Sequence, residues 1–105
     1  MKFKEYIGQT VNIIIDSHMG TKHPKLGYYF PINFGHIENS KMEAFVMGVF
    51  KPIQRFTGTV IAILTENSES EIFLVVAPDG KTYTDEAILA ITEFRNNIFD
   101  VVVMR

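Results

Sequence analysis

The strongest constraint on the fold comes from two apolar runs that flank one short polar loop. The first run, Thr57–Thr65, reads TGTVIAILT, and the second, Glu71–Ala77, reads EIFLVVA. Short runs rich in Val, Ile and Phe predict β-strands, and the polar loop Glu66–Ser70 predicts a hairpin turn between them. Because both runs are apolar on both faces, we expect each strand to be covered on both sides, as in a closed or covered sheet.

Four other segments also predict extended structure. Pro31 favours an extended backbone at the residue before it. On these signals we predict strands or extended pieces at Thr10–Asp16, Tyr28–Ile32, Glu43–Phe50 and Asp100–Met104.

A tight turn and one helix complete the prediction. In the turn, Pro78 is expected to fix φ at the first central position, and Gly80 to take the positive φ that follows. The helix is expected over Asp85–Phe99, with Thr84 as its N-cap. Its apolar stripe is predicted to consist of Ala87, Ile91, Phe94 and Ile98.

These elements predict a mainly β fold, namely a small closed five-stranded OB-like β-barrel with one C-terminal α-helix. Short strands joined by tight turns favour such a barrel, whereas a doubly wound sheet needs several helices. The chain has 105 residues, so we expect a single domain over residues 1–105.

The composition excludes several classes of function. The formal net charge is −2 and the ten Lys and Arg residues are scattered, which argues against a nucleic-acid or anionic-membrane partner. The absence of cysteine excludes disulfides, thiolate zinc sites and a cysteine nucleophile. The N-terminus lacks the apolar segment of a signal peptide, so a cytoplasmic location is expected.

Acidic residues gather in two of the predicted loops. If both loops open at one barrel mouth, their carboxylates could form a site for a hard cation such as Mg²⁺ or Mn²⁺. The alternative is that polar loops simply contain glutamate. The acidic residues are Glu38, Glu43, Glu66, Glu69 and Glu71. The three histidines, His18, His23 and His36, lack helical metal spacing and are expected in loops or half-buried positions.

Several segments, in order, resemble the soluble inorganic pyrophosphatases, the barrel-type, Mg²⁺-dependent family. The match begins with YFPINFGHI and EAFVMG, and continues with GTVIAIL, LVVAP and TDEAILAITEFRNNIF. The likeness covers Val11–Phe99. The loop His23-Pro24-Lys25 is similar to that of a compact bacterial subgroup.

The resemblance implies a substituted active site. The three signature aspartates fall on Glu38, Ser40 and Glu43, and two aspartates of a second cluster fall on Glu66 and Glu71. Two motif tyrosines, an expected lysine and an expected glutamate fall on Phe30, Phe34, Phe73 and Ile14.

The resemblance also implies roles for the residues that remain. Mg²⁺, with Mn²⁺ as an alternative, would bind at Glu38, Glu43, Glu66 and Glu71, with Glu38 and Glu43 as the catalytic carboxylates. Phosphate would contact Lys22, Lys25 and Lys41. The implied activity is metal-dependent hydrolysis of pyrophosphate or another small phosphoanhydride, weakened by the substitutions. The alternative is a catalytically inactive relative that acts as a binding or oligomerisation module, and a homo-oligomer is left open.

Overall fold

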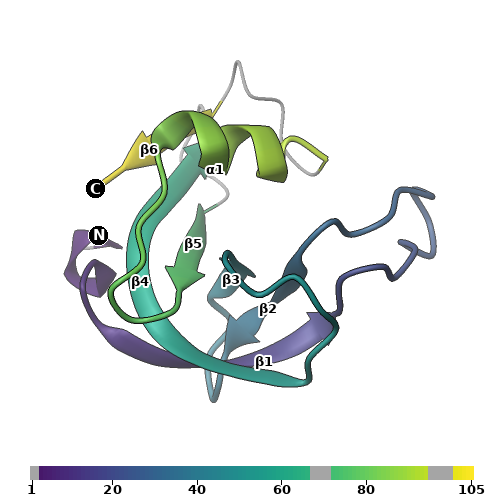
Figure 1. Ribbon diagram of the computed structural model, residues 1–105, viewed down its shortest axis with the longest axis horizontal. Coiled ribbons are helices and arrows are strands. Elements are labelled where there is room, and N and C mark those ends of the chain that lie inside the picture. The colour runs from purple at the N-terminus through teal and green to yellow at the C-terminus, as the bar shows by residue number, and fades with distance from the viewer. Residues whose placement is uncertain (1–2, 67–71, 95–100) are drawn as a thin grey trace.

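The computed structural model describes residues 3–66, 72–94 and 101–105 (Figure 1). One 3₁₀ turn, six strands and one α-helix lie in this part of the chain. In chain order they are η1 Phe3–Tyr6, β1 Thr10–Ser17, β2 Asn33–Ile37, β3 Glu43–Val46, β4 Arg55–Glu66, β5 Ile72–Ala77, α1 Asp85–Thr92 and β6 Val101–Met104.

The first five strands close into a barrel. They pair in the order β1-β2-β3-β5-β4, and β4 pairs back with β1 through Thr59 and Thr10. The β3–β5 pair is parallel and the other pairs are antiparallel, so the barrel is mixed. β6 is added to the second half of β4. The predicted closed five-stranded barrel with one helix is therefore confirmed.

Two apolar clusters explain why the strands are apolar on both faces. One cluster fills the barrel, and its buried members are Val11, Ile13, Ala44, Val46, Val60, Ile63, Leu74 and Val76. The other lies on the outer face of β2, β3, β5 and β4, where Phe34, Phe45, Leu64 and Phe73 pack in one cluster with Ile88 of α1. Burial of such side chains contributes about 1.5–3 kcal/mol each.

Several predicted bounds were wrong. β2 is a strand, whereas only the preceding Tyr28–Ile32 was expected to be extended. β3 ends at Val46 because the chain turns at Gly48, whose φ is +86°. The last strand runs over Val101–Met104, and its predicted first residue, Asp100, lies outside the described residues, so that bound stays a prediction.

The helix is shorter than predicted, and its predicted apolar stripe is correct in part. Thr84 is the N-cap as expected, and its hydroxyl accepts a hydrogen bond from the backbone N–H of Ala87. The helix ends at Thr92, whose hydroxyl bonds back to the carbonyl of Ile88. Ala87 is exposed and Ile88 is buried in its place, whereas Ile91 and Phe94 are half-buried and pack against the outer cluster as predicted; Ile98 lies outside the described residues.

The turn after β5 is also placed differently. The N–H of Lys81 bonds to the carbonyl of Pro78 at 3.0 Å, so Pro78 precedes the two central positions instead of taking the first. Gly80 has φ +79°, as expected.

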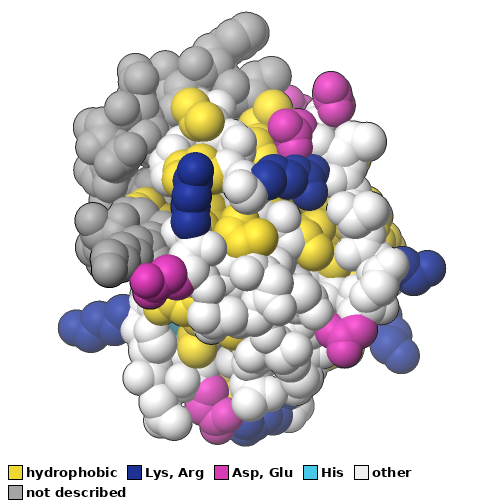
Figure 2. Space-filling view, turned by 90° about the vertical axis from the view of Figure 1, so that its left-hand side faces the viewer, with side chains coloured by type: hydrophobic (Ala, Val, Ile, Leu, Met, Phe, Trp, Pro, Cys, Tyr) yellow, Lys and Arg dark blue, Asp and Glu magenta, His cyan; other side chains and the backbone are white. Residues whose placement is uncertain are grey.

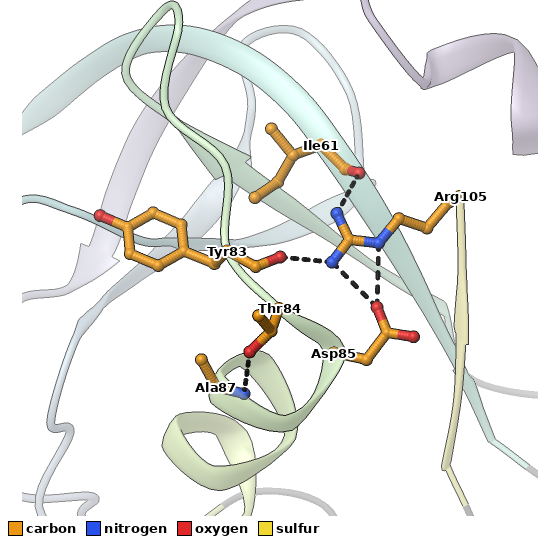
Figure 3. A network of polar contacts seen from close by, with 6 residues as sticks. All are labelled: Ile61, Tyr83, Thr84, Asp85, Ala87 and Arg105. Carbon is orange, nitrogen blue, oxygen red and sulfur yellow. Dashed lines mark hydrogen bonds and ion pairs between the residues drawn. The ribbon is translucent and has the colours of Figure 1, made fainter.

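Arg105 joins the end of the chain to the start of α1 (Figure 3). Its Nε lies 2.9 Å from Oδ1 of Asp85, and its guanidinium also donates to the carbonyls of Tyr83 and Ile61. None of the helices in the described ranges is long and apolar enough to cross a membrane.

Candidate functional site

The topology brings the ends of two acidic segments to one end of the barrel. β3 and β5 run parallel, with Glu43 opposite Phe73, and the hairpin partner of Ile72 on β4 is Thr65. The start of β3, the end of β4 and the start of β5 therefore lie at the same end of the barrel, which we call the barrel mouth. The residues between β4 and β5 lie outside the described ranges, so a shared opening of the two acidic segments stays a prediction.

Glu43 lies at this end of the sheet, where β3 begins. It is the first residue of β3, it is half-buried, and it stands between His36 of β2 and Phe73 of β5 in the sheet register. Its side chain shares the outer face of β3 with Phe45, since successive residues of a strand point to opposite faces. The apolar cluster around Phe45 and Phe73 thus fixes the strand that carries the carboxylate.

A bulge in β1 adds a pair that the sequence did not reveal. The register between β1 and β2 shifts between Ile15 and Ser17, and a bulge of this kind can re-aim a side chain. Asp16 lies within the shift, and its Oδ2 is 2.7 Å from Nδ1 of His36. The prediction for His36 was only a loop or half-buried histidine. His36 forms this polar pair because β1 and β2 pair in the sheet, and the spacing of residues in the sequence does not predict that pairing.

Two cavities adjoin beside Glu43 on the outer face of β1, β2 and β3, and both are lined by Asp16 and Glu43. The first, of about 320 Å³, is called the polar cavity and is lined by Asp16, His36, Ser40, Lys41 and Glu43. The second, of about 330 Å³, is called the aromatic cavity and is lined by Asp16, Ser17, His23, Pro24, Tyr28, Phe30, Phe34 and Glu43.

Aromatic rings occupy the positions where the resemblance places polar phosphate ligands. The ring centroids of Phe34 and Phe73 are 6.0 Å apart, and those of Phe34 and Phe30 are 5.9 Å apart. All three rings are at most 6% exposed. They pack well but carry no group that binds phosphate. The hydroxyl of Tyr28 is buried and has no hydrogen-bond partner among the described residues.

The predicted site residues are only partly brought together. Of the glutamates, Glu43 lines both cavities, whereas Glu38 lines neither and forms a 2.8 Å ion pair with Arg55. The backbone of Glu66 ends β4 opposite Val101 of β6. Glu69 and Glu71 lie outside the described residues.

The three predicted lysines also separate. Lys41 lines the polar cavity. Lys22 and Lys25 are exposed on the segment of residues 18–29 between β1 and β2, which projects from the barrel as an arm (Figure 1). The Nζ of Lys22 lies 6.0 Å from the ring centroid of Tyr29, near the edge of cation–π range.

The donor set of the polar cavity fits a magnesium ion in part. Proteins commonly hold Mg²⁺ through one or two carboxylates, while water and substrate phosphates complete the octahedron. Asp16 and Glu43 supply two carboxylates to one cavity. Within residues 3–66, 72–94 and 101–105 there is no preformed group of three or more acidic or histidine ligands, so an ion held here would depend on substrate oxygens and water.

The fold is similar to that of solved pyrophosphatases. A crystal structure of inorganic pyrophosphatase from Ehrlichia chaffeensis has a TM-score of 0.63 and 14% identity, covering 90% of this chain and 84% of that one. A structure titled inorganic phosphatase from Anaplasma phagocytophilum has a TM-score of 0.59 and 15% identity, covering 90% and 81%. At this identity the likeness establishes the fold alone. Comparisons with family profiles and with curated protein sequences gave no match.

Proposed function

We propose that the protein is a divalent-metal-dependent phosphoanhydride hydrolase of the pyrophosphatase type, with pyrophosphate as the default substrate. The observation that carries this proposal is the polar cavity, where Glu43, Asp16 and Lys41 line one cavity on the outer face of a pyrophosphatase-like barrel.

The chain's own residues then take distinct roles. Glu43 and Asp16 hold the cation, and Lys41 contacts phosphate, since a lysine ammonium donates charge-assisted hydrogen bonds to phosphate oxygens. Bound Mg²⁺ or Mn²⁺ would neutralise phosphate oxygens and make water a better nucleophile. In the sequence, Glu66 and Glu71 flank the loop between β4 and β5, and we propose them as further metal ligands.

Two groups of residues that were predicted for the site have smaller roles in the proposed mechanism. Glu38 would join the site only after release from Arg55. Lys22 and Lys25 line neither cavity, so Lys41 is the phosphate contact that we propose.

The turnover is expected to be slow. Phe34 and Phe73 stand where the resemblance places a tyrosine and a lysine, and each missing charge-assisted contact costs about 1.5–3 kcal/mol. A glutamate in place of an aspartate also moves a ligand by about one bond length, and a misplacement of about 1 Å can cost roughly 100-fold in rate.

Phosphate release from pyrophosphate, measured with Mg²⁺ and with Mn²⁺, tests the proposal. The wild type should turn over substrate, and Glu43→Gln should lower the rate by about 100-fold. Asp79→Asn is the matched control, because Asp79 follows the far end of β5 and bonds to Thr59 there. Equal rates for the wild type and Glu43→Gln would reject hydrolysis at this site.

The second candidate is a non-catalytic binding module on the same barrel. The buried ring of Phe73 directly beside Glu43 favours it, because a second phosphate would face apolar surface there. Calorimetry with pyrophosphate and Mg²⁺ distinguishes the two readings. Heat of Mg²⁺-dependent pyrophosphate binding that disappears in Glu43→Gln supports the hydrolase site, whereas no heat with either ligand supports the module.

A nucleic-acid role is not favoured. On the face of Figure 2, acidic and basic side chains are interspersed and are not gathered into a basic patch. Nucleic-acid binding depends on clustered Lys and Arg that neutralise phosphates.

A further inference from the structure

The two cavities differ in the kind of group that each can accommodate. They adjoin beside Glu43, and Asp16 and Glu43 line both of them. Lys41 lines only the polar cavity, and among the described residues no Lys or Arg lines the aromatic cavity. A phosphoryl group therefore meets a cationic side chain in the polar cavity and none in the described lining of the aromatic one.

His23 does not supply a cation to the aromatic cavity either. Its Nδ1 accepts hydrogen bonds from the backbone N–H groups of Lys25 at 3.1 Å and Leu26 at 3.0 Å. A ring nitrogen that accepts a hydrogen bond carries no hydrogen, whereas both ring nitrogens of a charged histidine are donors. In this turn His23 is therefore an uncharged imidazole.

Much of the wall of the aromatic cavity is apolar. Pro24 is exposed, and His23 and Tyr28 are half-buried with their ring centroids 4.9 Å apart. The hydroxyl of Tyr28 is itself buried, so the accessible part of this side chain is not its polar end. Phe30 and Phe34 are at most 6% exposed and add no polar group to the lining.

From these features we propose that the site takes an organic monophosphate, with its phosphoryl group in the polar cavity and an uncharged apolar group in the aromatic cavity. Inorganic pyrophosphate would place its second phosphoryl group against apolar side chains, where the lost hydration of a charge is not compensated. The aromatic cavity, of about 330 Å³, suits a compact apolar group. This inference rests on the proposed function and narrows its substrate class.

Hydrolysis of such a substrate is a displacement at phosphorus. A water oxygen bonds to phosphorus, the bond from phosphorus to the organic oxygen breaks, and that oxygen leaves with the electron pair. An acyl phosphate gives a carboxylate and phosphate, which keeps both protons of the water. A phosphate ester gives an alcohol or phenol, whose oxygen takes one of these protons, and phosphate.

Binding of stable phosphonates tests the ligand class apart from turnover. Phenylphosphonate and methylphosphonate carry the same charged group, so the difference between their affinities, measured with Mg²⁺ at a pH where both are dianions, reports the apolar group alone. Titrations of the full chain followed by ¹H–¹⁵N chemical shifts should give phenylphosphonate about tenfold tighter binding. It should also give additional shifts at the backbone amides of Ser17 and Tyr28. Equal affinities, or no additional shifts at these amides, would overturn the proposal.

Two variants on the arm separate the cavity wall from the rest of the arm. Pro24→Ser removes exposed apolar surface from the wall, so it should weaken phenylphosphonate binding about threefold and leave methylphosphonate binding unchanged. Leu26→Ser is the matched control and should change neither, because Leu26 is 67% exposed on the same arm and lines neither cavity. Equal effects of the two variants on phenylphosphonate would contradict binding in the aromatic cavity.

Turnover distinguishes this inference from the hydrolase itself. Benzoyl phosphate, an anhydride, and phenyl phosphate, an ester, are compared with pyrophosphate in the presence of Mg²⁺, after subtraction of the uncatalysed rates. We expect kcat/KM for benzoyl phosphate about tenfold above that for pyrophosphate, and a still higher value for phenyl phosphate would identify the ester as the substrate. Hydrolysis of pyrophosphate alone would overturn this inference and leave the hydrolase intact. Preferential binding of phenylphosphonate without turnover of any substrate would reject the hydrolase and support the ligand class.

Discussion

At the scale of single residues, Asn33 shows how one buried polar side chain holds the base of the site. Its side chain is fully buried and accepts a hydrogen bond from the N–H of Met19 at 2.9 Å. Its amide donates to the carbonyls of Val49 and Lys51 at 3.3 and 2.9 Å. The arm and the β3–β4 connection are therefore tied to β2, which carries Phe34 and His36.

Asn33→Asp should destabilise the protein strongly. The change replaces the amide donor by an oxygen that faces two carbonyls in a buried position, so we expect a loss of about 3 kcal/mol in unfolding free energy. Urea unfolding measures it. Asn12→Asp is the control, because the side chain of exposed Asn12 accepts a bond from Thr57 and aspartate can accept it too. Losses of similar size in the two variants would contradict this account.

Gly35 is required by close backbone approach between β1 and β2. A Cβ atom there would lie 1.9 Å from the carbonyl oxygen of Ile14 and 2.9 Å from Cα of Ile15. Such backbone atoms cannot move aside as a flexible side chain can. The glycine thus permits the strand pairing that precedes the bulge at Asp16.

Gly35→Ala should therefore cost about 3 kcal/mol or more, or prevent folding. Gly80→Ala is the comparison, since Gly80 has open space around it but φ of +79°, and that strain costs about 1–2 kcal/mol. Thermal unfolding followed by circular dichroism ranks the two. A Gly35→Ala variant that is more stable than Gly80→Ala would show that the strands separate easily.

At the scale of elements, α1 depends on its N-terminus more than on its length. The helix has eight residues, and helices this short are marginal without tertiary contacts. The Thr84 cap and the Arg105 contacts to Asp85 and Tyr83 secure its first turn (Figure 3). Ile88 then anchors it on the outer cluster of the barrel.

Thr84→Ala should lower the unfolding free energy by about 1 kcal/mol, because the N–H of Ala87 loses its acceptor. Thr84→Ser keeps the hydroxyl and should be close to the wild type. The denaturant midpoints of the two variants and the wild type give this comparison, provided that the slope of unfolding free energy against denaturant concentration is the same for all three. Equal losses in Ala and Ser variants would mean that the methyl group of Thr84, and not its cap, stabilises the helix.

The elements also show what the sequence could and could not predict. β-branched runs identified β1, β3, β4 and β5, because local propensity and burial agree there. β2 was missed because NFGHI contains a glycine that the pairing requires and only a short apolar pattern. The Asp16–His36 pair and the Glu38–Arg55 ion pair both depend on strand register, and register joins residues that no local pattern connects.

At the scale of the whole molecule, β4 holds the fold together. It pairs with β1 and β5 of the barrel and also with β6. One strand therefore connects the barrel to the C-terminal strand. The parallel pairing of β3 and β5 brings the starts of both strands to one end of the barrel, and the two cavities lie beside Glu43 on the outer face of β1, β2 and β3. Because the site residues come from these three paired strands, the site should persist only while the strands stay paired.

Unfolding should accordingly be a single cooperative transition. The chain has no Trp and four Tyr residues, so tyrosine fluorescence reports tertiary packing and far-ultraviolet circular dichroism reports secondary structure. The two signals should give one shared urea midpoint, as expected for a small two-state domain. Separate midpoints would show that some part of the molecule, such as the helix with its C-terminal strand, unfolds independently of the barrel.

The most direct test of the central claim is anomalous diffraction from a crystal soaked with Mn²⁺ and pyrophosphate. The account predicts a Mn²⁺ peak in the polar cavity, about 2.1 Å from a carboxylate oxygen of Glu43, with phosphate density toward Lys41. A peak elsewhere on the surface, or none beside Glu43 at saturating Mn²⁺ and pyrophosphate, would contradict it.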